Sequence, residues 1–300
     1  MDQRLLRSTP VQILSKSRRL YFGLVVFIPF IAMVVAVYWC WNREVGFIDL
    51  AVFLMLYGLT GLSITAGFHR LFAHHSYKTI RPVRYLFAIF GSMAAQGFFF
   101  TWIAEHRIHH RGSDQEGDPH SPHTGKRGPL RGILHAHIGW LFDKRIEDPA
   151  PFVADLVSDP VLCFIDRSWW LWIALGLLIP ATIGWVIEGG RGALRGLVWG
   201  GLVRIFIVNH VTWSVNSICH MWGARAFRTN DFSTNMPLIG ILAIGEGWHN
   251  NHHAFPSSAR HGLVRGQFDA TWVFIRCLEL LRLAWGVRTP DKSLINRLKL

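Results

Sequence analysis

The sequence is poor in cysteine and in acidic residues. Only four of its 300 residues are cysteines, and they lie too far apart to form a paired metal-binding or redox motif. We therefore expect buried free thiols at Cys40, Cys163, Cys219 and Cys277. The 19 acidic residues are outnumbered by 31 lysines and arginines, which gives a net charge of +12. Because this excess lies in tails and loops beside apolar runs, it favours anionic lipid headgroups over nucleic acid as a partner.

Charge is also missing from long stretches of the chain. The mean hydropathy is +0.26 and 51% of the residues are hydrophobic, which is high for a soluble protein. A membrane-spanning helix needs about 20 apolar residues. Four stretches approach this length, and the first three of them carry no charge: 21–41, 50–68, 168–187 and 197–219. We predict a single-domain, all-α integral membrane protein with four transmembrane helices.

The basic residues predict how these helices are oriented. Residues 1–20 contain five cations and lack the features of a cleavable signal peptide, so we expect a retained cytoplasmic tail. The loop after the first predicted span has only Arg43. Arg191 and Arg195, in the next outer loop, weaken this asymmetry without reversing it. A multi-pass protein with both termini in the cytoplasm is expected.

The chain is rich in histidine, with 16 residues that gather beside the ends of the apolar runs. Nine of them form four sets: His69 and His74; His106, His109 and His110; His220; and His249, His252 and His253. Residues three and four apart share a helical face, so the second and last sets can each direct three imidazoles to one point. His69 and His74 are five apart, and we expect a helix end or turn between them. Nine imidazoles are too many for one four-coordinate ion, so two metal ions are predicted.

Other interpretations of the histidines fit less well. A zinc-protease pair at His106 and His110 would need glutamate directly after the first histidine, where Arg107 stands. Six single histidines are expected to be surface or hydrogen-bonding residues: His120, His123, His135, His137, His210 and His261. His75 follows the predicted ligand His74 directly but does not fit the spacing of the ligand sets, so its role stays open. Three acids are either supports for ligand imidazoles or solvated loop residues: Glu105, Asp118 and Glu246.

The position of the uncharged run 85–104 decides whether the histidines can meet. It lies between the first two sets, and a crossing of the bilayer there would place those sets on opposite sides. We therefore predict an interfacial or protein-buried helix for this run. All the sets then lie at the cytoplasmic face.

Three histidine segments resemble the three histidine boxes of membrane fatty-acyl desaturases: His69-Arg-Leu-Phe-Ala-His74, Glu105-His106-Arg-Ile-His109-His110 and Trp248-His249-Asn-Asn-His252-His253. Asn216-Ser-Ile-Cys-His220 is similar to a further element of the acyl-CoA Δ9 (stearoyl-CoA type) branch. The resemblance covers about residues 50–290. It implies a cytoplasmic helical cap formed by 69–167 and 221–300, which would carry the metal site. It also implies nine histidines that hold two ferrous ions, with O2 as co-substrate, and a catalytic, water-linked role for Asn216.

The resemblance also implies a hydrophobic tunnel that binds the substrate and bends beside the irons. Gln96, Trp102 and Thr212 would frame the bend, although ordinary helix packing also explains these three residues. The far end would fall at Tyr57, with Gly61 one turn on. Tyr57 is equally consistent with an aromatic anchor at the membrane interface.

The headgroup end of the tunnel departs from the family pattern. Lys144 and Arg145 match a basic pair that meets the phosphates of coenzyme A. Ile103 and Ala104, however, stand where one further arginine contact is expected. The basic pair favours a CoA thioester without excluding a phospholipid or a carrier-protein thioester.

The expected function is an oxygen-dependent desaturase that inserts a cis double bond, at Δ9, into a saturated acyl chain carried on CoA. We expect no fused cytochrome domain, so the electron donor would be a separate protein such as a ferredoxin, a rubredoxin or a cytochrome b5-type protein. An acyl-lipid desaturase, a fatty-acid hydroxylase or an alkane monooxygenase could use the same metal site. A histidine-rich membrane metal transporter is the alternative from another class.

Overall fold

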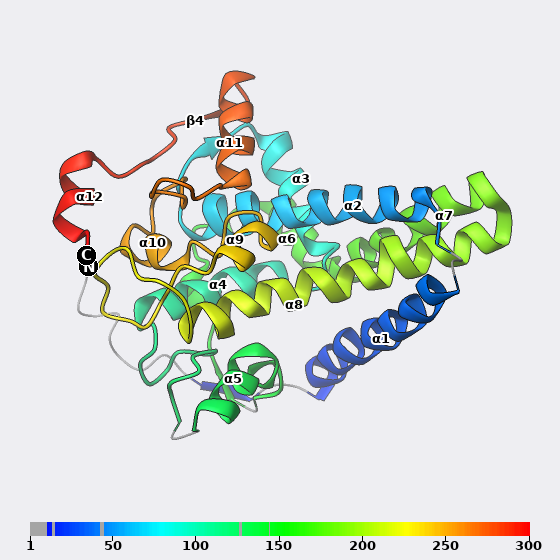
Figure 1. Cartoon of the computed structure of the whole chain (residues 1–300), viewed down its shortest axis with the longest axis horizontal. Coiled ribbons are helices and arrows are strands. Elements are labelled where there is room, and N and C mark those ends of the chain that lie inside the picture. The colour runs from blue at the N-terminus through cyan, green and yellow to red at the C-terminus, as the bar shows by residue number, and fades with distance from the viewer. Residues whose placement is uncertain (1–10, 14–15, 43–44, 126–127, 144) are drawn as a thin grey trace.

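The computed structural model describes residues 11–13, 16–42, 45–125, 128–143 and 145–300. Four long helices, α1, α2, α7 and α8, extend together from one side of the molecule, and the shorter helices and loops gather at the other (Figure 1). The α-helices are α1 Lys16–Trp41, α2 Phe47–Leu62, α3 Arg81–Ser92, α4 Phe99–Arg111, α5 Pro129–His137, α6 Pro160–Arg167, α7 Trp169–Gly196, α8 Arg204–Ser217, α9 Pro237–Leu242, α10 His249–Ala254, α11 Ala270–Leu280 and α12 Lys292–Leu298.

Helices of other types and short strands complete the fold. Two π-helices continue long helices without a break, η2 (Ser63–Ala73) after α2 and η5 (Leu197–Val203) before α8. The 3-10 helices are η3 Gly139–Phe142, η4 Ala150–Phe152 and η6 Ile218–His220. Two antiparallel pairs are formed by β1 (Val11–Ile13) with β3 (Arg145–Glu147), and by β2 (Lys78–Thr79) with β4 (Ala284–Trp285). Both pairs tie distant parts of the chain together.

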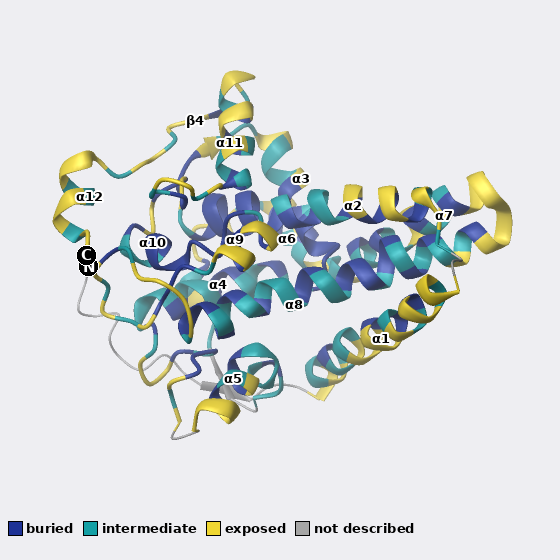
Figure 2. Ribbon diagram, in the orientation of Figure 1, coloured by how far each residue is buried: buried dark blue, intermediate teal, exposed yellow. Residues whose placement is uncertain are grey.

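Within the described residues, three helical runs are long and apolar enough to cross a membrane: Lys16–Trp41, Phe47–Ala73 and Trp169–His220. The first begins at Lys16, so the end of the predicted tail is helical. Many large apolar side chains along these runs are exposed, such as Phe27 at 64% and Leu54 at 55%. Figure 2 colours much of α1 as exposed or intermediate. Such surfaces are unfavourable in water and favourable in a lipid environment.

The third run, Trp169–His220, reverses direction within its 52 residues. Glu188 and Gly189 have non-helical backbone angles, and Gly189 has a φ of 64° that favours glycine. On either side of this reversal, Gly184 packs so tightly on Gly192 that neither position has room for a Cβ. Gly196 packs against Pro180 in the same way. The run is therefore two antiparallel helices joined by a tight turn.

The run 85–104 was predicted as one helix, and this is wrong. It is divided between α3 and α4 by a turn in which Ala95 and Gly97 have φ values of 57° and 107°. The turn is held in place by side chains of α8: Arg204 Nη1 donates to Met93 O at 2.9 Å, and Asn209 Nδ2 donates to Ala94 O at 3.1 Å. Because hydropathy does not register a turn held by tertiary contacts, the sequence did not reveal it.

The prediction of four buried thiols is also only partly right. Cys219 is buried and Cys163 is partly buried, but Cys40 and Cys277 are exposed. Cys40 lies in the last turns of α1, a helix whose apolar side chains mostly face outward, and Cys277 lies on the outer face of α11.

Candidate metal centre

A π-helix brings the first two predicted ligands together. His69 lies in η2, and His74 N donates to His69 O at 3.1 Å, a bond between residues five apart. This wider helical turn places the two imidazoles side by side, with ring centroids 4.8 Å apart. The helix does end between them, at Ala73, as expected, but the π-helical turn before that end is what brings the two residues together, because a π-helix makes residues five apart neighbours as an α-helix does residues four apart.

The nine predicted ligands converge from four segments into two groups. Helix α4 contributes three histidines, α10 contributes three, η6 contributes one, and η2 with the residue after it contributes two. Group A is His69, His74, His106, His110 and His252, and group B is His109, His220, His249 and His253. Within each group the ligand atoms lie within 4.8 Å of one another.

The Nε2 atoms of all nine histidines face one another. In group A, His74 Nε2 is 2.7 Å from His106 Nε2, and His252 Nε2 is 3.1 Å from His69 Nε2 and 2.9 Å from His110 Nε2. In group B, His220 Nε2 is 3.0 Å from His249 Nε2. His109 Nε2 is 3.4 Å from His253 Nε2 in the same group. The imidazoles therefore present one kind of nitrogen to two shared centres.

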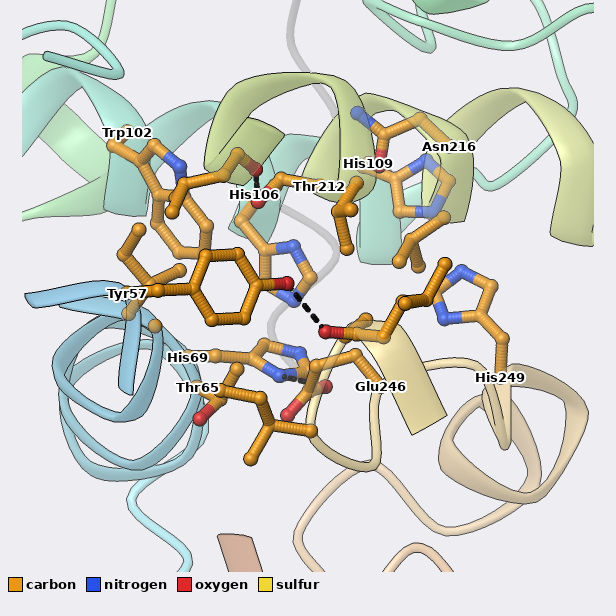
Figure 3. A pocket seen from close by; sticks show the side chains of 18 residues that line it. Tyr57, Thr65, His69, Trp102, His106, His109, Thr212, Asn216, Glu246 and His249 are labelled. Carbon is orange, nitrogen blue, oxygen red and sulfur yellow. Dashed lines mark hydrogen bonds and ion pairs between the residues drawn. The ribbon is translucent and has the colours of Figure 1, made fainter. Parts of the chain in front are cut away.

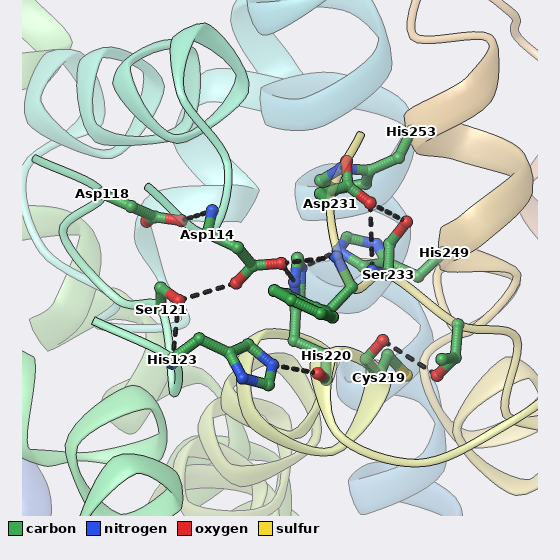
Figure 4. Close-up of polar contacts among 12 residues, drawn as sticks. Asp114, Asp118, Ser121, His123, Cys219, His220, Asp231, Ser233, His249 and His253 are labelled. Atoms are coloured by element: carbon green, nitrogen blue, oxygen red, sulfur yellow. Dashed lines mark hydrogen bonds and ion pairs between the residues drawn. The ribbon is translucent and has the colours of Figure 1, made fainter. Parts of the chain in front are cut away.

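Carboxylates lie against the opposite nitrogen of four of these rings. Asp118 lies 2.9 Å from His109 Nδ1, Asp114 lies 2.8 Å from His220 Nδ1 and Asp231 lies 2.7 Å from His253 Nδ1. Figure 4 shows the last two contacts. In group A, Glu246 lies 2.6 Å from His69 Nδ1. Such contacts hold the proton on Nδ1 and leave the Nε2 lone pair for a metal.

Group B contains a close pair of ring nitrogens that suits a metal ion. Because His109 and His253 both hold a carboxylate at Nδ1, both direct Nε2 into the 3.4 Å space between them. Contact with Asp118 outweighs burial and raises the pKa of His109, so a proton can occupy this space, and a divalent cation can take the place of that proton and accept both nitrogens. This set of imidazoles with carboxylate support therefore fits a metal site.

Burial keeps several of these imidazoles neutral. The pKa values of His106, His110 and His253 lie well below the ordinary histidine value, first because burial disfavours the imidazolium ion and then because neighbouring imidazoles repel it. Burial raises the pKa of Asp118, but the contact with His109 outweighs it and holds that carboxyl below its usual value. The site therefore combines neutral nitrogen ligands with ionised supports.

Two of the three predicted supporting acids, Asp118 and Glu246, do contact a histidine of the site. Glu105 does not fit this prediction, because its carboxylate accepts a hydrogen bond from Arg18 Nη2 of α1 at 2.7 Å. The sequence interpretation missed Asp114 and Asp231. Both are loop acids near a histidine segment, but only the fold shows which imidazole each one meets.

Two histidines that were expected to stand alone lie beside the groups. His261 is buried, with its ring 4.5 Å from that of His252 and its Nδ1 3.2 Å from Glu246. The ring of His120 is 4.5 Å from that of His109. His75, by contrast, has a largely exposed side chain that contacts Arg107 and Asp155. The sequence had no signal for His261, because it follows the last histidine set by eight residues.

An apolar pocket of about 630 Å³ empty volume opens beside both groups. We call it the apolar pocket: its wall contains His69, His106, His109 and His249, together with apolar side chains of η2, α8 and α9 (Figure 3). Five predicted substrate or catalytic residues line it: Tyr57, Gly61, Trp102, Thr212 and Asn216. Tyr57 OH donates to Leu242 O at 2.6 Å.

The predicted bend residues form one hydrogen-bonded chain at this wall. Trp102 Nε1 donates to Gln96 Oε1 at 3.0 Å, and Gln96 Nε2 donates to Thr212 Oγ1 at 2.8 Å.

The side chains of the two predicted headgroup contacts are not described. Lys144 lies outside the described residues, and for Arg145 only the backbone, in β3, is described.

Comparison with known proteins agrees with this arrangement. Residues 47–267 match the model of the fatty acid desaturase family. The chain belongs to the fatty acid desaturase family. As a desaturase it is an oxidoreductase, and its histidine groups are able to hold metal ions.

Similar proteins include two desaturases and an acetylenase whose names give different acyl carriers. This desaturase is 41% identical to the sn-1 stearoyl-lipid 9-desaturase of Anabaena variabilis, over 81% of this chain and 85% of the relative. It is 38% identical to the Delta-9 acyl-lipid desaturase 1 of Arabidopsis thaliana, over 83% and 78%. It is also 38% identical to the hex-5-enoyl-[acyl-carrier protein] acetylenase of Moorena producens (strain JHB), over 93% and 89%.

The carboxylates around group B give a first prediction. Replacing Asp231 by asparagine should weaken the binding of a divalent metal ion, with Fe2+ as the probe, about 10- to 100-fold, because His253 loses the charged acceptor that fixes its tautomer. Iron bound per chain, titrated anaerobically on the purified protein, measures this effect. Glu116→Gln is the matched control, since Glu116 is an exposed acid of the loop that carries Asp114 and Asp118. Equal iron affinity in both variants would contradict the supporting role.

Proposed function

We propose that the protein uses two ferrous ions and O2 to insert a cis double bond at Δ9 of a saturated fatty-acyl chain. The observation that carries this proposal is the convergence of nine Nε2 atoms on two centres in the wall of the apolar pocket. When bound there, iron supplies the oxygen activation that removes hydrogen from an unactivated methylene. The nine histidines would hold the ions, five in group A and four in group B.

We also propose that the four long helices are four transmembrane spans. The tight turn at Glu188–Gly189 supports this topology, because it makes two antiparallel helices from the third candidate run. An even number of crossings leaves the N-terminus, the C-terminus and the histidine groups on one side, and the basic residues near the N-terminus make that side cytoplasmic. The shorter helices would then form the cytoplasmic cap of one domain.

The remaining residues of the site would position the chain and exclude water. An acyl chain that follows the apolar pocket passes Trp102 and Thr212 and ends at Tyr57. The rigid Trp102–Gln96–Thr212 chain of hydrogen bonds fixes the wall at which the chain bends, and a bent chain favours the cis product. Asn216 lies in the same wall, where its amide can hold a water molecule near the ions.

A glycerolipid-bound chain is the carrier that we favour over a CoA thioester. The two Δ9 relatives above are named for lipid-bound chains, whereas the acetylenase is named for a chain on acyl-carrier protein. Ile103 and Ala104 are fully buried, so the chain offers no cation where a CoA phosphate contact was expected. Lys144 and Arg145 remain the argument for CoA. Electrons would come from a separate protein such as a ferredoxin, a rubredoxin or a cytochrome b5-type protein.

One feeding experiment tests the reaction and the carrier together. Cells that express the protein receive deuterated stearate for short pulses, and mass spectrometry locates any new double bond in the CoA, carrier-protein and glycerolipid fractions. We expect Δ9 cis product that appears first in glycerolipid. A hydroxylated chain in place of an alkene would show that the site is a hydroxylase, and unaltered stearate would contradict the proposed function.

A further inference from the structure

A second pocket shares part of its wall with the apolar pocket. Four residues line both: Trp102, His106, Thr212 and Asn216. The residues that line only the second pocket all carry polar groups: Gln96, Glu105, His120, Trp140 and Trp213. We call it the polar pocket. An acyl chain that occupied both pockets would pass from apolar to polar surroundings at these four shared residues. One of them, His106, belongs to group A.

The polar pocket carries little net charge. Glu105 is the one acid among the described residues of its wall, and Arg18 Nη2 neutralises it at 2.7 Å. No lysine or arginine is among its lining residues, as far as the described chain shows. As described, this polar wall suits an uncharged acceptor such as a carbonyl oxygen better than a phosphate.

One hydrogen-bond donor in the wall of the polar pocket, Trp140 Nε1, has no acceptor among the described residues. Trp140 lies in η3 with its ring 5.3 Å from that of His120, edge to face. Its Nε1 is buried and has no hydrogen-bond acceptor among the described residues, whereas Trp102 Nε1 donates to Gln96. His120 Nδ1 is also buried and makes no hydrogen bond in that part of the chain, but it lies 3.8 Å from Asp118 Oδ1. Buried indole N–H groups normally find an acceptor, so this one points to a ligand atom.

We propose that the polar pocket binds the carbonyl end of the acyl chain, and that Trp140 Nε1 donates a hydrogen bond to the acyl carbonyl oxygen. This inference rests on the proposed function, because it takes the apolar pocket as the site of the hydrocarbon end. A fixed carbonyl contact sets how many carbons separate that end from the histidine groups. The carbonyl belongs to an ester in a glycerolipid and to a thioester in acyl-CoA, and the test distinguishes the two.

The test compares ligands that differ only in that carbonyl. Binding constants are measured on the purified protein for a stearoyl glycerolipid ester and the matching octadecyl ether, and for stearoyl-CoA and its thioether analogue. We expect the wild type to bind the carbonyl form of the natural carrier about 2- to 10-fold more tightly than the form without it, which is the range of one hydrogen bond. Trp140→Phe should reduce that ratio to about one, because it removes the donor and keeps an aromatic ring.

Controls separate a lost contact from a damaged fold. Unchanged ether binding by Trp140→Phe shows that the pockets are intact, and Trp170→Phe, which alters an exposed tryptophan of α7, should keep the wild-type ratio. The inference is overturned if the wild type does not distinguish carbonyl from ether in either pair, a result that needs no variant. It is also overturned if Trp140→Phe keeps the wild-type ratio. Both measurements are independent of double-bond formation, so they can fail while the proposed reaction stands.

Discussion

Replacing His74 by alanine should abolish double-bond formation. His74 Nε2 lies 2.7 Å from His106 Nε2 within group A, and its ring also packs against those of His69, His110 and His252. Removing one nitrogen ligand lowers the affinity of the site for its ion and opens a position that the chemistry does not use. The amount of unsaturated product, measured by mass spectrometry, and the iron bound per chain should both fall.

The neighbouring residue provides a matched control. His75 follows His74 directly, but its side chain is 56% exposed and contacts Arg107 and Asp155 rather than either group. Its backbone has a φ of 50°, so asparagine, which tolerates this conformation, is a better replacement than alanine. His75→Asn should keep iron binding and most of the activity. If His74→Ala kept full activity and iron, the assignment of group A would be wrong.

We propose that Tyr57, which lines the apolar pocket, closes its far end. Replacing Tyr57 by alanine should therefore let the protein accept chains about two to four carbons longer, because loss of the phenol ring opens a cavity there. The ring packs on Phe53, with centroids 5.8 Å apart, and its hydroxyl is bonded to Leu242 O. The variant is tested with saturated chains of increasing length, and the longest chain that gains a double bond is recorded.

Tyr57→Phe separates the bulk of this side chain from its hydrogen bond. Phenylalanine keeps the ring and loses only the bond to Leu242 O, so the length limit should stay at the wild-type value. An aromatic anchor at the membrane interface predicts a different outcome. In that case Tyr57→Ala would reduce stability or insertion and leave the product lengths unchanged.

The histidine pattern could be predicted from the sequence because it depends on local spacing. His106, His109 and His110 share a face of any α-helix, as do His249, His252 and His253. The π-helix that joins His69 to His74 could not be predicted, because an uncommon helix type has no reliable signature in composition. The four apolar runs were also visible, and the hairpin at Glu188–Gly189 follows from the glycines between two of them.

Contacts between segments far apart in the chain could not be predicted from the sequence. Asp231 is 22 residues from His253, and Asp114 is 106 residues from His220. Nothing local distinguishes these acids from Glu105, which was expected to support a ligand and instead pairs with Arg18. The turn between α3 and α4 has the same origin, since it depends on Arg204 and Asn209 of α8. Tertiary partners, rather than propensity, decide these features.

The arrangement of the ligands also argues against a metal transporter. A transport path needs sites spaced along the spans, whereas all nine histidines converge in two neighbouring groups. Helices α4 and α10, which carry six of them, lie on the side of the molecule away from the outer ends of the long helices (Figure 1). Their supporting carboxylates are buried or partly buried, which suits ions that stay in place. Catalysis by resident ions is the interpretation that fits the family.

The central claim is that nine histidines hold two iron ions, one in each group. The most direct test is an anomalous-scattering map at the iron absorption edge, from crystals of protein loaded with Fe2+ under anaerobic conditions. The account predicts two peaks, one bounded by His69, His74, His106, His110 and His252 and the other by His109, His220, His249 and His253. A single peak, or a peak outside these two groups, would contradict it.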